Sequence, residues 1–97
     1  MRIKWLRFAL ADIAEIAEYI SKDNPNAALK LVGMIWHQSL PLKDHPEIGR
    51  AGRVMNTREL VIENSKYIIP YWIIDDEIQI LRVFHSSRKW PDRFDVE

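Results

Sequence analysis

The sequence contains no cysteine, only three glycines and no long hydrophobic run. Without cysteine the chain cannot form a disulfide, and a zinc site would have to use histidines and carboxylates alone. His37 and His45 have no third ligand at metal spacing and no glycine-rich phosphate loop is present, so we expect no metal and no cofactor. The longest apolar stretch, Tyr67–Ile74, has eight residues and contains Pro70. A membrane helix needs about 20 apolar residues, and with no signal-peptide pattern either we expect a cytoplasmic protein that does not contact membranes.

Net charge is absent as well, because 14 lysines and arginines balance 14 aspartates and glutamates. A protein that coats nucleic acid by bulk electrostatics would be strongly basic, so the composition argues against that class. The positive charge is nevertheless segregated into residues 50–58 and 82–89. A length of 97 residues with 47% hydrophobic and 29% charged residues predicts one globular domain over residues 1–97.

Hydrophobic periodicity predicts a strand followed by two helices in the first half of the chain. Charged and apolar residues alternate over residues 2–6, which is typical of a short strand with one buried face. An amphipathic helix follows from Phe8 to about Ser21. Asn24 can cap a second helix that begins at Pro25 and ends near residue 40, because Pro41 would clash with the preceding turn. The short connection makes these helices an antiparallel hairpin.

After a loop over residues 41–56, β-branched and aromatic residues predict three strands, at residues 57–63, 66–74 and 77–84. Two-residue separators leave room only for hairpins, so the strands form an antiparallel meander. A loop at Asp75-Asp76 would pair Ile74 with Glu77 and Tyr71 with Ile80, and then Ile69 with Arg82 and Tyr67 with Phe84. Pro70 cannot donate to a ladder and predicts a bulge or an unpaired stretch. The fold class is therefore α+β in the order β-α-α-β-β-β, with a frayed tail at residues 91–97.

Two acid-free stretches hold the residues that could carry chemistry, namely Arg50, Arg53 and Arg58 in the first and Arg82, His85, Arg88 and Lys89 in the second. Arginines around a histidine suit phosphodiester chemistry, because guanidiniums neutralise a developing phosphorane and histidine titrates near pH 7. The alternative is that the arginines form ordinary ion pairs with Glu59, Glu63 and the acidic tail. Arg82 lies within an apolar strand, so it either reaches a carboxylate or lines a concave polar site. Trp72 and Trp90 belong to the core or receive a partner.

Six stretches of the chain, in their order and spacing, resemble the RelE/ParE superfamily of bacterial type II toxin–antitoxin toxins: Asp12–Ile20, Asn24–Ala28, His45–Arg50, Arg58–Val61, Tyr67–Tyr71 and Ile80–His85. The resemblance extends from the first strand to Trp90-Pro91. The β-α-α-β-β-β order agrees with the fold that it implies. It also implies a cognate antitoxin that lays a helix or strand over the hairpin and sheet, forming a hetero-oligomer.

Two mechanisms occur in this superfamily. RelE-like toxins cleave mRNA in the ribosome, whereas ParE-like toxins trap DNA gyrase and catalyse no known reaction. Tyr67 stands where RelE-like nucleases usually carry arginine, and the chain is neutral, so it resembles the ParE branch more closely. The target-binding residues would then be Arg50, Arg53, Arg58, Arg82, His85, Arg88, Lys89 and Trp90. In the RelE-like alternative, His85, Arg82 and Arg58 would be catalytic in an endoribonuclease. A third hypothesis is a non-toxic protein-interaction domain.

Overall fold

The computed structural model describes residues 1–96, and Glu97, the last residue of the predicted tail, lies outside the described residues. Two helices form the hairpin, α1 (Arg7–Ser21) and α2 (Pro25–Ser39), followed by a 3-10 turn, η1 (Leu40–Lys43). The strands are β1 (Arg2–Trp5), β2 (Arg50–Ala51), β3 (Arg58–Val61), β4 (Tyr67–Ile74), β5 (Glu77–Ile80) and β6 (Phe84–His85). No helix among residues 1–96 is long and apolar enough to span a membrane.

The strands form one mixed sheet in the order β1-β5-β4-β3-β2, and β6 also pairs with β4. The predicted meander is confirmed, because β3, β4 and β5 are antiparallel neighbours. The N-terminal strand β1 completes one edge by pairing parallel to β5, so the α+β class and the element order are also confirmed. Residues 50–51, which the sequence assigns to a loop, pair instead with β3 at the opposite edge.

Counted from the Asp75-Asp76 turn back along β4, the predicted register holds as far as Tyr71 and is wrong on the far side of Pro70. Tyr71 pairs with Ile80 as expected, but Tyr67 pairs with His85 rather than with Phe84. Between these pairs, residues 81–83 stand opposite residues 69–70, so three residues face two and form a bulge. The N–H of Leu81 donates to the carbonyl of Pro70 at 3.0 Å. The bulge therefore lies where Pro70 lacks a donor, and Arg82 has no partner on β4.

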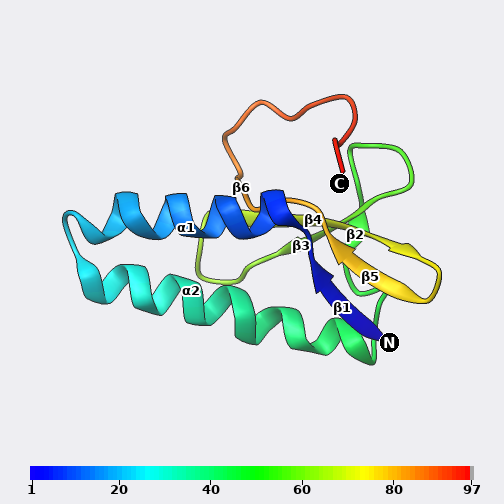
Figure 1. Ribbon diagram of the computed structural model, residues 1–97, viewed down its shortest axis with the longest axis horizontal. Coiled ribbons are helices and arrows are strands. Elements are labelled where there is room, and N and C mark those ends of the chain that lie inside the picture. Colours follow the sequence, from blue (N-terminus) through cyan, green and yellow to red (C-terminus); the bar gives the residue numbers. More distant parts are fainter. Residues whose placement is uncertain (97) are drawn as a thin grey trace.

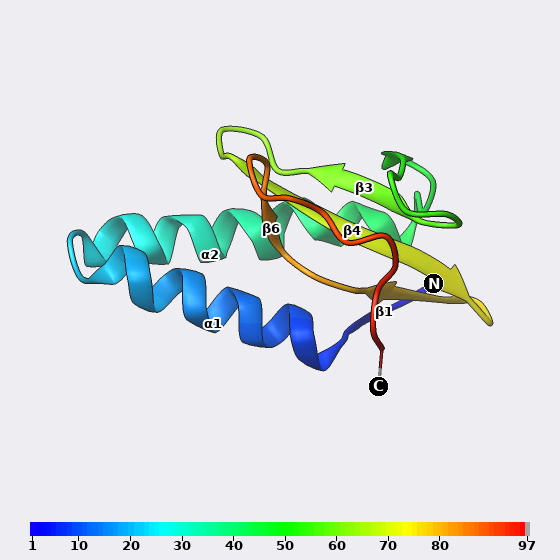
Figure 2. The same ribbon diagram turned by 90° about the horizontal axis from the view of Figure 1, so that it is seen from above.

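The helical hairpin packs against one face of the sheet and extends beyond it, as both views show (Figures 1 and 2). The Asn24 side chain accepts a hydrogen bond from the N–H of Ala27 at 3.1 Å, and Pro25 occupies the first turn, which confirms the predicted start of α2. The main core joins α1, α2, η1 and the sheet, and its buried residues are Ala9, Ile13, Leu31, Ile35, Leu42, Ile62, Ile69, Tyr71, Ile78, Ile80 and Val83.

A second cluster covers the face of the sheet that the helices leave free. Its buried residues are Leu6, Val54, Leu81, Phe84 and Phe94, with Trp72 and Trp90 packed against them. The C-terminal segment closes over this face, opposite α2 (Figure 1). The expectation of a frayed tail from residue 91 is therefore corrected at Phe94, which is only 9% exposed. Burying the ring of Phe94 offsets the conformational entropy that the polar tail loses when it becomes ordered. The charge composition of the tail does not reveal this contribution.

Candidate functional site

A row of two aromatic side chains, flanked at each end by an arginine, crosses the second cluster. The guanidinium of Arg88 lies 4.1 Å from the ring centre of Phe84, and that of Arg53 lies 4.2 Å from the ring centre of Trp90. The two rings meet edge to face at 5.2 Å. This aromatic–arginine row, Arg53-Trp90-Phe84-Arg88, joins the two basic stretches, which are separate in sequence, on one side of the sheet. Arginine above an aromatic face is a favourable contact that leaves the cation accessible.

Glu59 organises the first basic stretch. It is paired with Pro70 across β3 and β4, so its side chain lies on the same face as the second cluster, and it is 1% exposed. Its carboxylate accepts hydrogen bonds from Nε of Arg50 at 3.1 Å and from the backbone N–H of Arg53 at 2.7 Å. Nε of Arg53 lies 3.8 Å from the same carboxylate. One carboxylate thus faces two guanidiniums, so the three side chains together keep a net positive charge. The two arginine side chains remain about half exposed.

Arg58 holds the loop before β2. Its Nη1 donates to the carbonyls of Glu47 at 3.2 Å and Gly49 at 2.8 Å. The Tyr71 hydroxyl supports the same loop, because it donates to the Pro46 carbonyl at 2.7 Å and accepts from the N–H of Gly49 at 2.9 Å. Burial raises the pKa of the Tyr71 phenol, so it remains neutral and able to donate. Arg58 therefore fixes loop conformation instead of facing the row.

Arg82 reaches a carboxylate, which is one of the two outcomes that the sequence leaves open. Its Nε and Nη2 donate to the two oxygens of Asp12 on α1 at 2.7 and 2.9 Å, a bidentate pair. Asp12 also accepts the N–H of Val83 at 2.9 Å. These hydrogen bonds raise the pKa of the Arg82 guanidinium, which stays charged. The pair closes the bulge against α1 and leaves few donors of Arg82 for a substrate.

His85 lies on the helix side of the row and lines a small cleft of about 190 Å³ with residues of α1, Tyr67 and Arg88. Its ring meets Tyr67 edge to face at 5.4 Å. The N–H of Ser87 donates to Nδ1 of His85 at 3.1 Å, so in the neutral ring the proton resides on Nε2. Lys89, the remaining basic candidate, is exposed.

Arg58 lies apart from His85, so the three candidates for catalysis do not all meet at one point. Arg58 pairs with Tyr71 and His85 pairs with Tyr67, on opposite edges of β4. Strand geometry then separates the Cα atoms of Arg58 and His85 by about 16 Å. Arg82 is bound to Asp12 between them. Within residues 1–96, no group of three or more histidine or acidic side chains could hold a metal ion.

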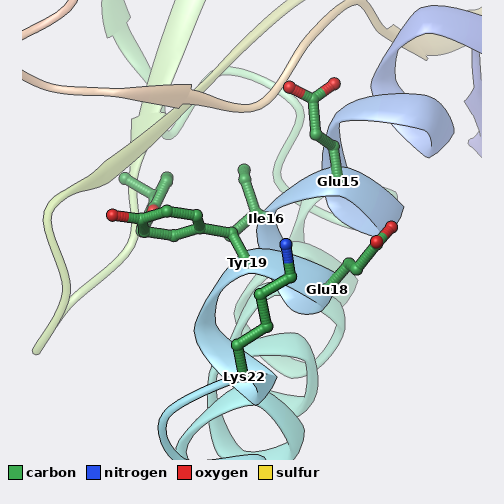
Figure 3. A pocket seen from close by; sticks show the side chains of 6 residues that line it. Glu15, Ile16, Glu18, Tyr19 and Lys22 are labelled. Carbon is green, nitrogen blue, oxygen red and sulfur yellow. The ribbon is translucent and has the colours of Figure 1, made fainter.

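A further pocket of about 340 Å³ lies between α1 and the start of β4 (Figure 3). It is lined by Glu15, Ile16, Glu18, Tyr19, Lys22 and Tyr67. The α1 residues among them fall at helical spacing on one side of the helix, as the labelled side chains show (Figure 3). Burial raises the pKa of the Tyr67 phenol at its edge. The pocket is amphipathic and more acidic than basic, in contrast to the row.

Sequence reasoning missed two residues on which this arrangement depends. Asp12 appears in the sequence as one acid among several on the polar side of α1, and nothing local connects it with a residue 70 positions away. Glu59 is visible as a possible ion-pair partner, but its burial is not. Strand alternation gives a signal for Glu59, because Leu60 and Glu59 cannot both point toward the helices.

The chain matches known proteins along most of its length. Residues 3–90 match the family model described as ParE toxin of type II toxin-antitoxin system, parDE. It is 44% identical over 90 residues to "Putative toxin Y4kP" of Sinorhizobium fredii, which covers 93% of each chain. It is 32% identical over 87 residues to "Toxin RelE2" of Caulobacter vibrioides, which covers 90% of this chain and 97% of the relative.

A solved structure titled "Chromosomal ParDE TA system from P. aeruginosa" superposes with a TM-score of 0.79 at 35% identity. The match covers 88% of this chain and 95% of that one. The resemblance to the RelE/ParE superfamily, which the sequence indicates, is therefore confirmed by these comparisons.

Proposed function

Because the chain belongs to the ParE toxin family of type II toxin–antitoxin systems, we propose that it inhibits bacterial growth by binding DNA gyrase. The observation that favours binding over catalysis is that both candidate arginines are engaged by other groups of the chain. Arg82 is engaged by Asp12 and Arg58 by backbone carbonyls of the loop before β2. Catalysis needs its groups within reach of one reacting atom, and Arg58 does not reach an atom held beside His85.

The aromatic–arginine row is the surface that we assign to the target. Tryptophan and arginine are the residues that most often dominate the energy of protein interfaces. Arg53 and Arg88 place positive charge on Trp90 and Phe84, so the surface suits an acidic region of a protein partner. The role in target binding that the sequence suggests for Arg58 and Arg82 becomes indirect, through the loop and the bulge that they hold.

We assign the opposite side of the molecule to a cognate antitoxin, with the two proteins meeting in the cytoplasm. Tyr19 and Leu29 are strongly exposed on the hairpin where it extends beyond the sheet. The amphipathic pocket beside Tyr67 is continuous with this surface. An antitoxin segment laid along α1 would cover this pocket and approach Arg88 at the adjoining cleft, while Arg53 and Trp90 stay at the other face of the sheet.

Purified protein added to gyrase and supercoiled plasmid tests the proposal. We expect cleaved DNA to accumulate, and Trp90→Ala and Arg53→Ala to weaken this effect by about tenfold or more, as interface hot spots do. Lys30→Ala, which removes an exposed charge from α2, serves as the matched control and should act like the wild type. Unchanged gyrase activity at saturating protein would contradict the proposal.

The RelE-like alternative retains one supporting observation, the similarity to "Toxin RelE2". In this case His85 would supply acid–base chemistry from its cleft, and ribosome-dependent cleavage of a message would be lost in His85→Ala. A third outcome is also testable, because expression without an antitoxin should arrest growth under both toxin hypotheses. Normal growth would instead favour a non-toxic interaction domain.

A further inference from the structure

We propose that Glu59 is a positioning residue that couples β3 to the C-terminal segment through Arg53 and Trp90, and thereby assembles the aromatic–arginine row. This inference rests on the proposed function for the use of the row, but not for the coupling itself. No sequence motif singles out Glu59 for such a role. Its burial and its contacts do.

The first step is the placement of Glu59. A carboxylate that is 1% exposed on an apolar sheet face is costly unless its oxygens are fully paired. The partners are supplied almost entirely by residues 50–53, through two guanidiniums and one backbone N–H. The carboxylate therefore fixes the conformation of the segment that carries Arg53, including its backbone at a distance of 2.7 Å.

The second step is the dependence of Trp90 on Arg53. Nε1 of Trp90 is buried and has no hydrogen-bond partner among residues 1–96, so no hydrogen bond from the ring sets its position. The ring is held by Arg53 at 4.2 Å on its face and by edge-to-face contacts with Phe84 and Phe94. Among residues 1–96, the last backbone hydrogen bond before the end of the chain joins Arg88 to His85. The segment after Arg88 is consequently held by side-chain contacts, and Arg53 is the only charged one on Trp90 in the described chain.

The third step is a built-in comparison. Arg50 and Arg53 both pair with Glu59, but only Arg53 contacts Trp90. If Glu59 acts merely as a buried anion that needs neutralising, Glu59→Gln should leave the Trp90 ring in place. If Glu59 positions the row, Glu59→Gln should move the ring as the loss of Arg53 does, whereas the loss of Arg50 should not.

The experiment records the indole N–H resonance of Trp90 by ¹H–¹⁵N NMR, together with gyrase-dependent DNA cleavage, in Glu59→Gln, Arg53→Ala and Arg50→Ala. We expect Glu59→Gln and Arg53→Ala to shift the Trp90 resonance and to weaken DNA cleavage by about tenfold, while Arg50→Ala leaves the Trp90 resonance near its wild-type position. Glu63→Gln, which neutralises an exposed acid just after the same strand, is the matched charge control. The double variant Glu59→Gln/Arg53→Ala should cleave DNA no more weakly than either single variant, because both changes interrupt the same chain of contacts.

Additive effects of Glu59→Gln and Arg53→Ala, or an unmoved Trp90 resonance in both, would overturn the proposal. If Glu59→Gln does not fold, Glu59→Asp replaces it, because the shorter side chain keeps the charge but withdraws the carboxylate from residue 53. An unmoved Trp90 resonance in folded Glu59→Asp would overturn the proposal. A wild-type protein without effect on gyrase would refute the proposed target, whereas the Trp90 resonance would still report whether Glu59 sets the row.

Discussion

The pair between Asp12 and Arg82 gives the sharpest quantitative prediction. Asp12→Ala removes both oxygens that bind the guanidinium and the acceptor of the Val83 N–H. Truncating one partner of a fully buried pair costs about 3–5 kcal/mol. Here the side chains are 25% and 13% exposed, so solvent screens part of the loss. We expect the free energy of unfolding to fall by about 2–3 kcal/mol.

Thermal unfolding followed by circular dichroism checks this value. For a domain of this size, the loss corresponds to a decrease in Tm of about 10–20 °C. Asp12→Asn keeps one acceptor for the Val83 N–H and should cost less than Asp12→Ala. On the alkaline side the stabilisation should persist well above neutral pH, because the pKa of the Arg82 guanidinium is raised and its charge is lost only at strongly alkaline pH.

A double-mutant cycle with Arg82→Met isolates the interaction, because methionine keeps the aliphatic bulk. We expect a coupling energy of about 1–2 kcal/mol. A coupling near zero, or a loss below about 0.5 kcal/mol in Asp12→Ala, would refute the structural role of the pair. If Arg82 were instead catalytic, Arg82→Met would abolish toxicity while the remaining folded fraction stayed high.

Three further changes test individual contacts. Tyr71→Phe leaves the Gly49 N–H without its acceptor and should lower the free energy of unfolding in urea by about 1–2 kcal/mol. Above about pH 10 the variant should lose less stability than the wild type, because the raised pKa of the Tyr71 phenol stabilises the wild-type fold only while the phenol is neutral. Glu77→Gln should flatten the fall in stability below about pH 4.5, because hydrogen bonding to Arg2 lowers the pKa of this carboxyl and the benefit is lost on protonation. Asn24→Ala should lower stability by about 1 kcal/mol through loss of the helix cap, and Asn24→Ser should restore most of it.

The local elements of the fold follow from local sequence signals, whereas the site follows from contacts between distant residues. Asn24-Pro25 encodes the start of α2 in neighbouring residues, and the Asp75-Asp76 turn sets the first pairs of its hairpin. Pro70 predicts an interruption, but the strand that absorbs the extra residue is chosen by the packing of both faces. The register change at β6 therefore could not be derived from the turn alone.

The same limit applies to the charged residues. Which acid receives Arg82 depends on where α1 crosses the bulge, and the pairing of Arg53 with Trp90 depends on the tail folding back. Periodicity carries no information about either. Phe94 is a single aromatic among charged residues, so the tail reads as frayed unless the uncovered apolar face of the sheet is known to be there.

Zero net charge is thus compatible with two surfaces of different character. The acids Glu15 and Glu18 line the pocket along α1, while one buried carboxylate, Glu59, faces two arginines, one of which lies on Trp90. Electrostatic interactions between exposed charges are screened over about 10 Å in physiological salt. The binding of a partner therefore depends mainly on the charges that it covers and little on the net charge of the chain. A neutral chain can therefore present an acidic, amphipathic surface to one protein and a cationic, aromatic surface to another, without the bulk basicity that nucleic-acid coating requires.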